Sequence, residues 1–130
     1  MRVIIAGSRT IDNIALVELA CYRAVQKWKK DDIRDYITEV VCGEAKGVDT
    51  LGKELAKKAN IPIKSFPAEW DKYGKKAGYL RNVQMAEYAD ALIAIWDGKS
   101  LGTKMMINLA KQNKLKVFVL NIGDNNETKT

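Results

Sequence analysis

The sequence predicts an α/β fold, a Rossmann-like three-layer sandwich around a mostly parallel five-stranded sheet. Short apolar runs rich in β-branched residues alternate with longer amphipathic segments, which is the order of consecutive βαβ units. Three of the apolar runs lead directly into glycine-containing turns, at residues 7–9, 42–49 and 97–103. In a parallel sheet these turns open at one edge, which is where open α/β sheets bind ligands.

The apolar runs have the length and composition of buried strands. We expect strands over residues 3–6, 36–41, 61–66, 90–96 and 116–120. Because Pro62 has no N–H to donate, it is tolerated only near the start of the third strand or if this strand lies at an edge. The strand order 3-2-1-4-5 satisfies that constraint and makes the first strand central. The ligand crevice is then expected between the first and fourth strands.

The segments between these strands carry apolar residues at the helical period of 3.6. We expect helices over residues 14–28, 48–59, 79–89 and 103–113. Asp12 or Asn13 is the expected N-cap of the first helix, and Thr103 is the expected N-cap of the fourth. Residues 67–78 are the longest irregular segment, and we expect a functional or mobile loop there.

The chain has 130 residues, of which 47% are hydrophobic. We expect one domain over residues 1–122, followed by a polar tail at residues 123–130 that frays. No apolar run approaches the roughly 20 residues that a membrane span needs. The first residues read as a strand and not as a signal peptide. The expected location is therefore the cytoplasm, with no membrane partner.

The sequence contains no histidine, which excludes Ser-His-Asp and Cys-His nucleophile systems. Its two cysteines, Cys21 and Cys42, do not make a disulfide framework. Cys21 is expected to be a small core residue, and Cys42 a small residue that fits a tight turn. A reactive thiolate at Cys42 is the alternative. No group of residues has zinc-like spacing, so neither a metal nor a cofactor is expected, and no catalytic residue is identified.

The formal net charge is +6, from 22 basic and 16 acidic residues. The basic residues are dispersed over several predicted helices, so solvated helix faces are the first interpretation. The alternative is a surface that attracts small anions. Dedicated binding of nucleic acid remains possible but is not favoured.

The turns and the long loop supply the candidate ligand-binding residues. Glycines let backbone N–H groups approach a phosphate, and the following helix N-termini favour an anion. These candidates are Gly7, Ser8, Arg9, Gly43, Glu44, Gly47, Asp49, Trp70, Lys75, Arg81, Asn82, Asp97, Gly98, Gly102 and Thr103. None of the turns is a G-x-G-x-x-G fingerprint or a P-loop.

Within this set, different side chains suit different parts of a nucleotide. Arg9 and Arg81 would pair with phosphate charge. Arg81 is expected near a helix N-terminus, where a cation opposes the helix dipole and so points to a bound anion. Asp49 or Asp97 would accept hydrogen bonds from ribose hydroxyls, and Trp70 or Tyr73 would stack on a base. The alternatives are that Asp49 caps the next helix and that Trp70 fills the core.

Several segments together carry a family resemblance. They are GEAKGVD at residues 43–49, FPAEW at 66–70, GKKAGYLRN at 74–82, Met85 and the Gly102-Thr103 pair. The chain resembles the YspA/cpYpsA-related branch of the SLOG superfamily over residues 4 to about 120, and the Gly-Lys-x-Ala-Gly-x-x-Arg-Asn segment is the most specific part. The resemblance implies a Rossmann-like fold that binds nucleotides or nucleotide-derived ligands. It also implies a homo-oligomer, because such relatives often pair as dimers.

The resemblance also bears on catalysis. Lonely-Guy enzymes of this superfamily carry a Pro-Gly-Gly-x-Gly-Thr-x-x-Glu signature, and Met106 stands here at the position of their catalytic Glu. A thioether cannot transfer a proton. The expected function is therefore binding without turnover, sensing or sequestering an ADP-ribose-type or cyclic nucleotide signal, in a phage or bacterial-immunity setting. The alternatives are a nucleotide N-glycosidase or phosphoribohydrolase-like enzyme using another carboxylate, and a DNA-processing or interaction module.

Overall fold

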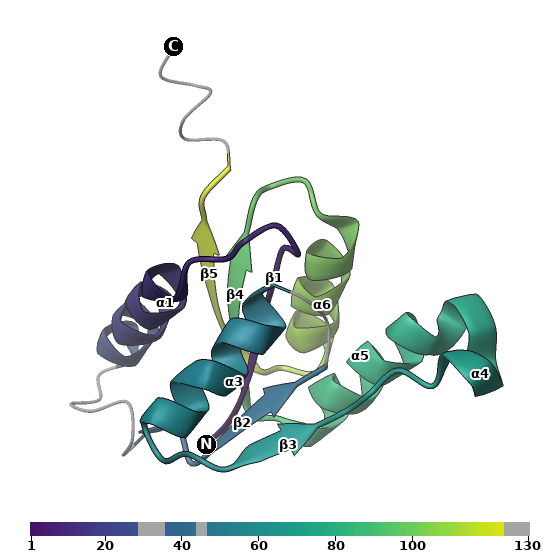
Figure 1. Cartoon of the computed structure of the whole chain (residues 1–130), viewed down its shortest axis with the longest axis horizontal. Helices are drawn as coiled ribbons and strands as arrows, with labels where there is room; N and C mark the ends of the chain where they lie inside the picture. Colours follow the sequence, from purple (N-terminus) through teal and green to yellow (C-terminus); the bar gives the residue numbers. More distant parts are fainter. Residues whose placement is uncertain (29–35, 44–46, 124–130) are drawn as a thin grey trace.

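The computed structural model describes residues 1–28, 36–43 and 47–123 of the chain. It contains a parallel five-stranded sheet with the order β3-β2-β1-β4-β5, which confirms the predicted fold and strand order (Figure 1). The strands are β1 (Arg2–Gly7), β2 (Glu39–Cys42), β3 (Ile63–Ser65), β4 (Ala91–Trp96) and β5 (Lys116–Asn121). β3 is an edge strand and begins after Pro62, as proline requires. The predicted second strand began too early, because pairing with β1 starts only at Glu39, opposite Arg2.

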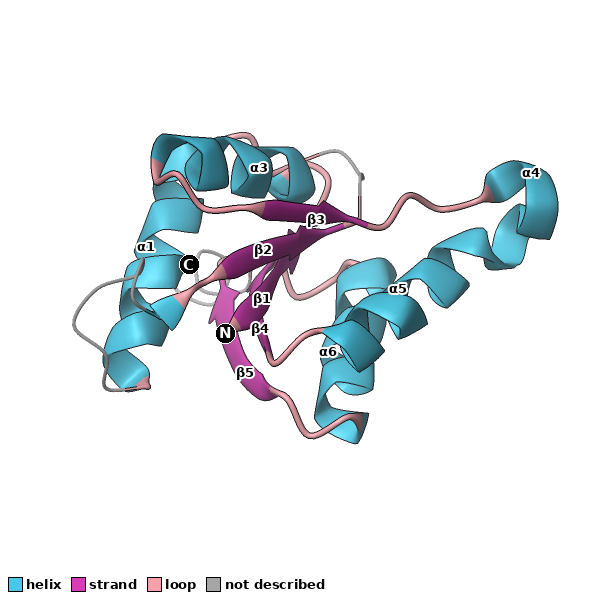
Figure 2. Ribbon diagram, turned by 90° about the horizontal axis from the view of Figure 1, so that it is seen from below, coloured by secondary structure: helices cyan, strands magenta, loops and turns pink. Residues whose placement is uncertain are grey.

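Helices cover both faces of the sheet. They are α1 (Ile14–Lys27), α3 (Val48–Lys58), α4 (Trp70–Tyr73), α5 (Ala77–Tyr88) and α6 (Leu101–Gln112), with a 3-10 turn η1 (Gly74–Lys76) between α4 and α5. α1 and α3 lie on one face, and α5 and α6 lie on the other (Figure 2). Along the described residues, no helix combines the length and the apolar character needed to cross a membrane.

The central strand β1 divides its side chains between two cores. Val3 and Ile5 pack into the core under α1 and α3, whereas Ile4 and Ala6 pack into the core under α5 and α6. This alternation follows from the two-residue period of a strand, and burial on both faces explains why the strand is apolar throughout. Each fully buried aliphatic side chain contributes about 1.5–3 kcal/mol relative to an exposed one. Both faces of β1 therefore contribute to the stability of the sheet.

The caps of two helices test the sequence predictions. Asn13 is the N-cap of α1, as expected, and its Oδ1 accepts a hydrogen bond from the Ala15 N–H at 2.9 Å. For α6 the prediction was wrong. Its N-cap is Ser100, whose Oγ accepts from the Thr103 N–H at 3.4 Å, so Thr103 lies inside the first turn. Either hydroxyl residue suits a cap, and the helix begins at the earlier one.

Residues 67–80 form an arm that extends away from the sheet and returns along α5 (Figures 1 and 2). The segment that was expected to be a loop is largely helical. Gly74 adopts a φ of 58°, which lets the chain turn between α4 and the next helix. Trp70 is 55% exposed on the arm, so the alternative of a core-filling tryptophan is wrong. Arg81 lies in the second turn of α5, too far from the helix start for the dipole argument to hold.

Gly7 ends β1 at a point of close contact. A Cβ there would lie 2.3 Å from the Ile95 carbonyl oxygen and 2.7 Å from Cγ2 of Val48. We predict that Gly7→Ala lowers the free energy of unfolding by about 3 kcal/mol or more, because a backbone carbonyl cannot move without disturbing the sheet. Urea denaturation measures the change. Gly102→Ala is the control, since its Cβ would meet nothing within 4 Å. A Gly7→Ala protein as stable as the wild type would contradict this packing.

Candidate functional site

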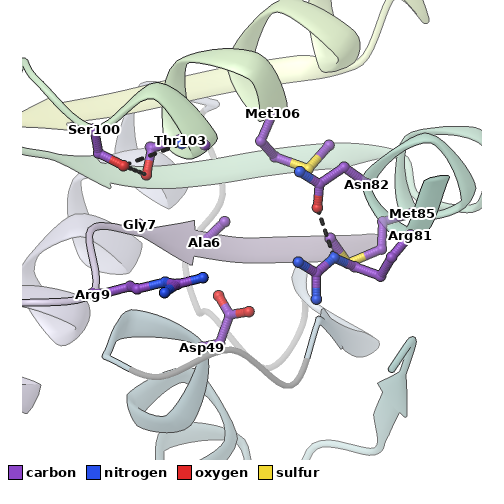
Figure 3. A pocket seen from close by; sticks show the side chains of 11 residues that line it. Ala6, Gly7, Arg9, Asp49, Arg81, Asn82, Met85, Ser100, Thr103 and Met106 are labelled. Atoms are coloured by element: carbon purple, nitrogen blue, oxygen red, sulfur yellow. Dashed lines mark hydrogen bonds between the residues drawn. The ribbon is translucent and has the colours of Figure 1, made fainter. Parts of the chain in front are cut away.

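A cleft lies at the carboxyl edge of the sheet, where β1 ends and where α6 begins after β4. β1 pairs with β2 on one side and β4 on the other, so this is the topological switch point of the sheet. The cleft holds about 510 Å³ of empty space, part of which is open solvent. Its lining comes from β1 and its turn, the start of α3, α5 and the first turns of α6 (Figure 3): Ala6, Gly7, Arg9, Asp49, Arg81, Asn82, Met85, Ser100, Gly102, Thr103 and Met106.

The structure brings together about half of the candidate residues. Those that line the cleft are Gly7, Arg9, Asp49, Arg81, Asn82, Gly102 and Thr103. Those that lie outside its lining are Ser8, Gly43, Gly47, Trp70, Lys75, Asp97 and Gly98, and Glu44 falls outside the described residues. The sequence reasoning missed Ala6, Met85, Ser100 and Met106 as lining residues. Ser100 had a signal, since serine is a preferred N-cap residue and Ser100 stands shortly before the predicted helical segment.

The charged groups of the cleft surround Asp49. Arg9 and Arg81 point toward its carboxylate from opposite sides (Figure 3). Asp49 is only 7% exposed, and one carboxylate oxygen accepts the Gly43 N–H at 3.3 Å. The alternative that Asp49 caps α3 is wrong, because the N-cap is Gly47 and Asp49 stands inside the first turn. The carboxylate instead joins the start of α3 to the end of β2.

Arg81 is held in place by its neighbours. Its Nη1 donates to the Gly43 carbonyl, and its Nε donates to Oδ1 of Asn82 at 2.8 Å. Burial is the main cause that lowers the pKa of Arg81; the Asp49 charge opposes this, and the Arg9 charge adds to it. Among the described lining residues, two guanidinium groups therefore face one carboxylate. An anion in the cleft would relieve the repulsion between the guanidinium groups.

The N-terminus of α6 supplies the other wall of the cleft. The first turn of a helix has N–H groups without intrahelical partners, and its dipole favours an anion. Thr103 is 5% exposed, and its Oγ1 lies 3.1 Å from Oγ of Ser100. A Cβ on Gly102 would meet only open space, so nothing in the described protein requires glycine at this lining position. The glycine leaves the helix backbone accessible from the cleft.

The other glycines of the site make room for the chain itself. Gly47 has a φ of 77°, and a Cβ there would lie 2.7 Å from the carbonyl oxygens of Ser8 and Arg9. A Cβ on Gly43 would lie 2.7 Å from Nη1 of Arg81. These close approaches pack the first two turns together and seat Arg81 against the second. The space beside Gly43 and Gly47 is therefore occupied by other atoms of the protein.

Asp97 shapes the loop that leads into α6. Its Oδ1 accepts the N–H groups of Ser100 at 2.7 Å and Lys99 at 2.8 Å. These bonds, of which the one from Ser100 has the largest effect, hold the pKa of Asp97 below its usual value. The Asp97 N–H donates to Oγ of Ser8 at 3.2 Å, which ties the loop to the turn after β1. Asp97 and the buried Ser8 therefore position the cleft wall.

Trp70 and Lys75 lie on the arm. Cη2 of Trp70 lies 3.4 Å from the point where a Cβ on Gly78 would stand, and Nη2 of Arg81 lies 3.8 Å from the same point. Both side chains thus lie near Gly78, but Trp70 does not line the cleft. Lys75 is exposed in η1.

Both cysteines are buried, and for Cys21 this confirms the prediction. Burial raises the pKa of the Cys21 thiol to about 12, so it remains a neutral core group. Sγ of Cys42 lies 3.8 Å from Oγ of Ser65 on the neighbouring strand. Within the described part of the chain, no three His, Cys, Asp or Glu side chains gather in a way that would hold a metal ion.

We predict that Asp97→Asn weakens the fold near neutral pH by less than about 1 kcal/mol, because the half-exposed carboxylate is screened by solvent. A carboxyl group whose folded pKa is lowered stabilises the protein above its unfolded pKa, and this contribution is lost as the pH falls through the folded value. The difference from the wild type should therefore shrink below about pH 4, as measured by urea denaturation at several pH values.

Asp12→Asn is the matched control. Asp12 is an exposed carboxylate for which the described structure gives no hydrogen bond, so its loss should leave stability unchanged at every pH. If the difference in stability between the Asp97→Asn protein and the wild type grew as the pH fell, the role assigned to Asp97 would be contradicted.

Comparison with known proteins assigns the family. The model of the YspA, cpYpsA-related SLOG family matches residues 1–73. The Gene 61 protein of Mycobacterium phage D29 is 35% identical over 91 residues, which is 65% of this chain and 71% of the phage protein. No solved structure matches significantly. The Rossmann-like sheet, the cleft at its switch point and the match over more than half of the sequence agree: the chain belongs to the YspA, cpYpsA-related SLOG family.

Proposed function

We propose that the cleft binds a nucleotide or a nucleotide-derived small molecule through its phosphate and does not turn it over. The observation that carries this proposal is the pair of arginines, Arg9 and Arg81, that face one carboxylate beside the N-terminus of α6. Two guanidinium groups and a helix N-terminus form a site for an oxyanion. Membership of the SLOG family, which suggests a nucleotide-related function, supports the same interpretation.

The geometry suggests how the ligand is held. The phosphate would lie against the first turn of α6, where Gly102 leaves the backbone open. Arg9 and Arg81 would pair with its charge. Asp49 lies between them and would accept hydrogen bonds from ribose hydroxyls, which is the role that an acidic side chain has in many Rossmann-like sites.

The chemistry of the cleft favours binding over catalysis. Met85 and Met106 are each 2% exposed and line the cleft with thioethers, which do not transfer protons. Asp49 is the carboxylate among the described lining residues, and it already accepts the Gly43 N–H. We therefore propose a sensor or a sequestering protein for an ADP-ribose-type or cyclic nucleotide signal.

We predict that Arg81→Ala weakens ligand binding at least tenfold, because a charge-assisted hydrogen bond contributes about 1.5–3 kcal/mol. The probes are AMP, cyclic AMP, ADP-ribose and inorganic phosphate. A ligand-induced rise in Tm detects binding, and calorimetry then measures the affinity. Chromatography of the same mixtures should detect no released base. Arg23→Ala is the control, since it removes a positive charge from the exposed face of α1. Release of the base, or equal affinities of the Arg81→Ala and Arg23→Ala proteins for the ligand, would contradict the proposal.

Gly102→Ala gives a second test that separates stability from binding. Alanine should stabilise the free protein by about 0.5–1 kcal/mol, because glycine is a poor helix former and the added methyl group meets no neighbour. The same methyl group should obstruct the phosphate and weaken binding at least tenfold. Denaturation and calorimetry on one preparation measure both effects. Unchanged affinity in a more stable protein would remove the α6 N-terminus from the site.

A further inference from the structure

We propose that the cleft is one half of a two-part site, and that the base of the ligand lies in a second hollow on the arm side of Arg81. This inference rests on the proposed function and specifies the ligand as a whole nucleotide. The second hollow holds about 180 Å³ of empty space, part of it open solvent. It is lined chiefly by Pro67, Glu69, Tyr73, Leu80, Gln84 and Arg81.

Arg81 is the wall that the two hollows share, since its side chain lines both. The hydrogen bonds to the Gly43 carbonyl and to Asn82 fix the guanidinium on the cleft side. Nη2 extends toward the point above Gly78, on the side of the arm. A planar guanidinium can pair with a phosphate at its edge and stack on a ring with its face. One residue thus contacts both halves of a nucleotide.

The two hollows differ in chemistry in the way that the two ends of a nucleotide differ. The cleft presents positive charge and a helix N-terminus. The second hollow presents the ring of Tyr73, which is 42% exposed. Nζ of Lys72 lies 5.1 Å from the centroid of that ring and adds positive charge beside it. Exposed aromatic rings next to cations are the surfaces on which bases stack in proteins.

Two polar side chains at the second hollow suit the edge of a base. Glu69 is an exposed carboxylate that accepts hydrogen bonds, and Gln84 is an exposed amide that both donates and accepts. The N–H groups and ring nitrogens of a nucleobase are their complements. A sugar phosphate would fill the first half of the site and leave these groups, and Tyr73, without contact.

The test compares ribose 5-phosphate with AMP and GMP by calorimetry. The wild type should bind at least one of the two nucleotides at least tenfold more tightly than the sugar phosphate, because stacking contributes about 1–3 kcal/mol. Tyr73→Ala should remove most of that difference and leave the affinity for ribose 5-phosphate unchanged. Tyr73→Phe should keep it. Tyr79→Ala is the matched control, since Tyr79 is 49% exposed on the same arm and lines neither hollow.

The outcomes distinguish this inference from the proposed function. If ribose 5-phosphate binds and the nucleotides bind no better, the second hollow takes no base and the inference is overturned, while the proposed function stands. If Tyr73→Ala changes the sedimentation of the free protein but not the difference in affinity, the arm is a contact between copies and the inference is also overturned. If no phosphate compound binds, both proposals are wrong.

Discussion

The close packing of two turns at the carboxyl edge of the sheet is the constraint on which the site depends. Gly7 and Gly47 have no side chains, so the turn after β1 can lie against the start of α3. This contact places Arg9 and Asp49 in one cleft although they are 40 positions apart in the sequence. The buried sheet beneath holds the contact rigid, because β1 packs on both faces.

Electrostatics then give the cleft its character. Asp49 compensates part of the charge of Arg9 and Arg81, while burial lowers the pKa of Arg81. Asp97 and Ser100 add no charged group to the lining, but they fix where α6 begins. The site is thus an arrangement of fixed donors around a space, with two methionines among the lining residues.

The sequence was most informative where a local pattern repeats. The alternation of strands and helices follows from apolar periodicity, and the position of Pro62 constrains the order of the strands; the three-layer fold and the strand order were both predicted. About half of the candidate residues line the cleft, because the glycine turns mark the carboxyl ends of strands. The arm was not predicted. Its helix α4 is four residues long, and such a short segment carries too little periodicity to be recognised.

The sequence by itself therefore determined the fold class, the edge of the sheet where the cleft lies and most of the charged groups near it. Only the tertiary structure decided that Gly43 makes room for Arg81 and that Ser100 starts α6. It also decided that Trp70 and Tyr73 lie on an arm outside the cleft. The reason is physical. The periodicity of apolar residues in the sequence identifies a strand or a helix, whereas the contacts of a side chain such as Arg81 depend on where α5 lies relative to β2. That placement is set by contacts between segments far apart in the sequence.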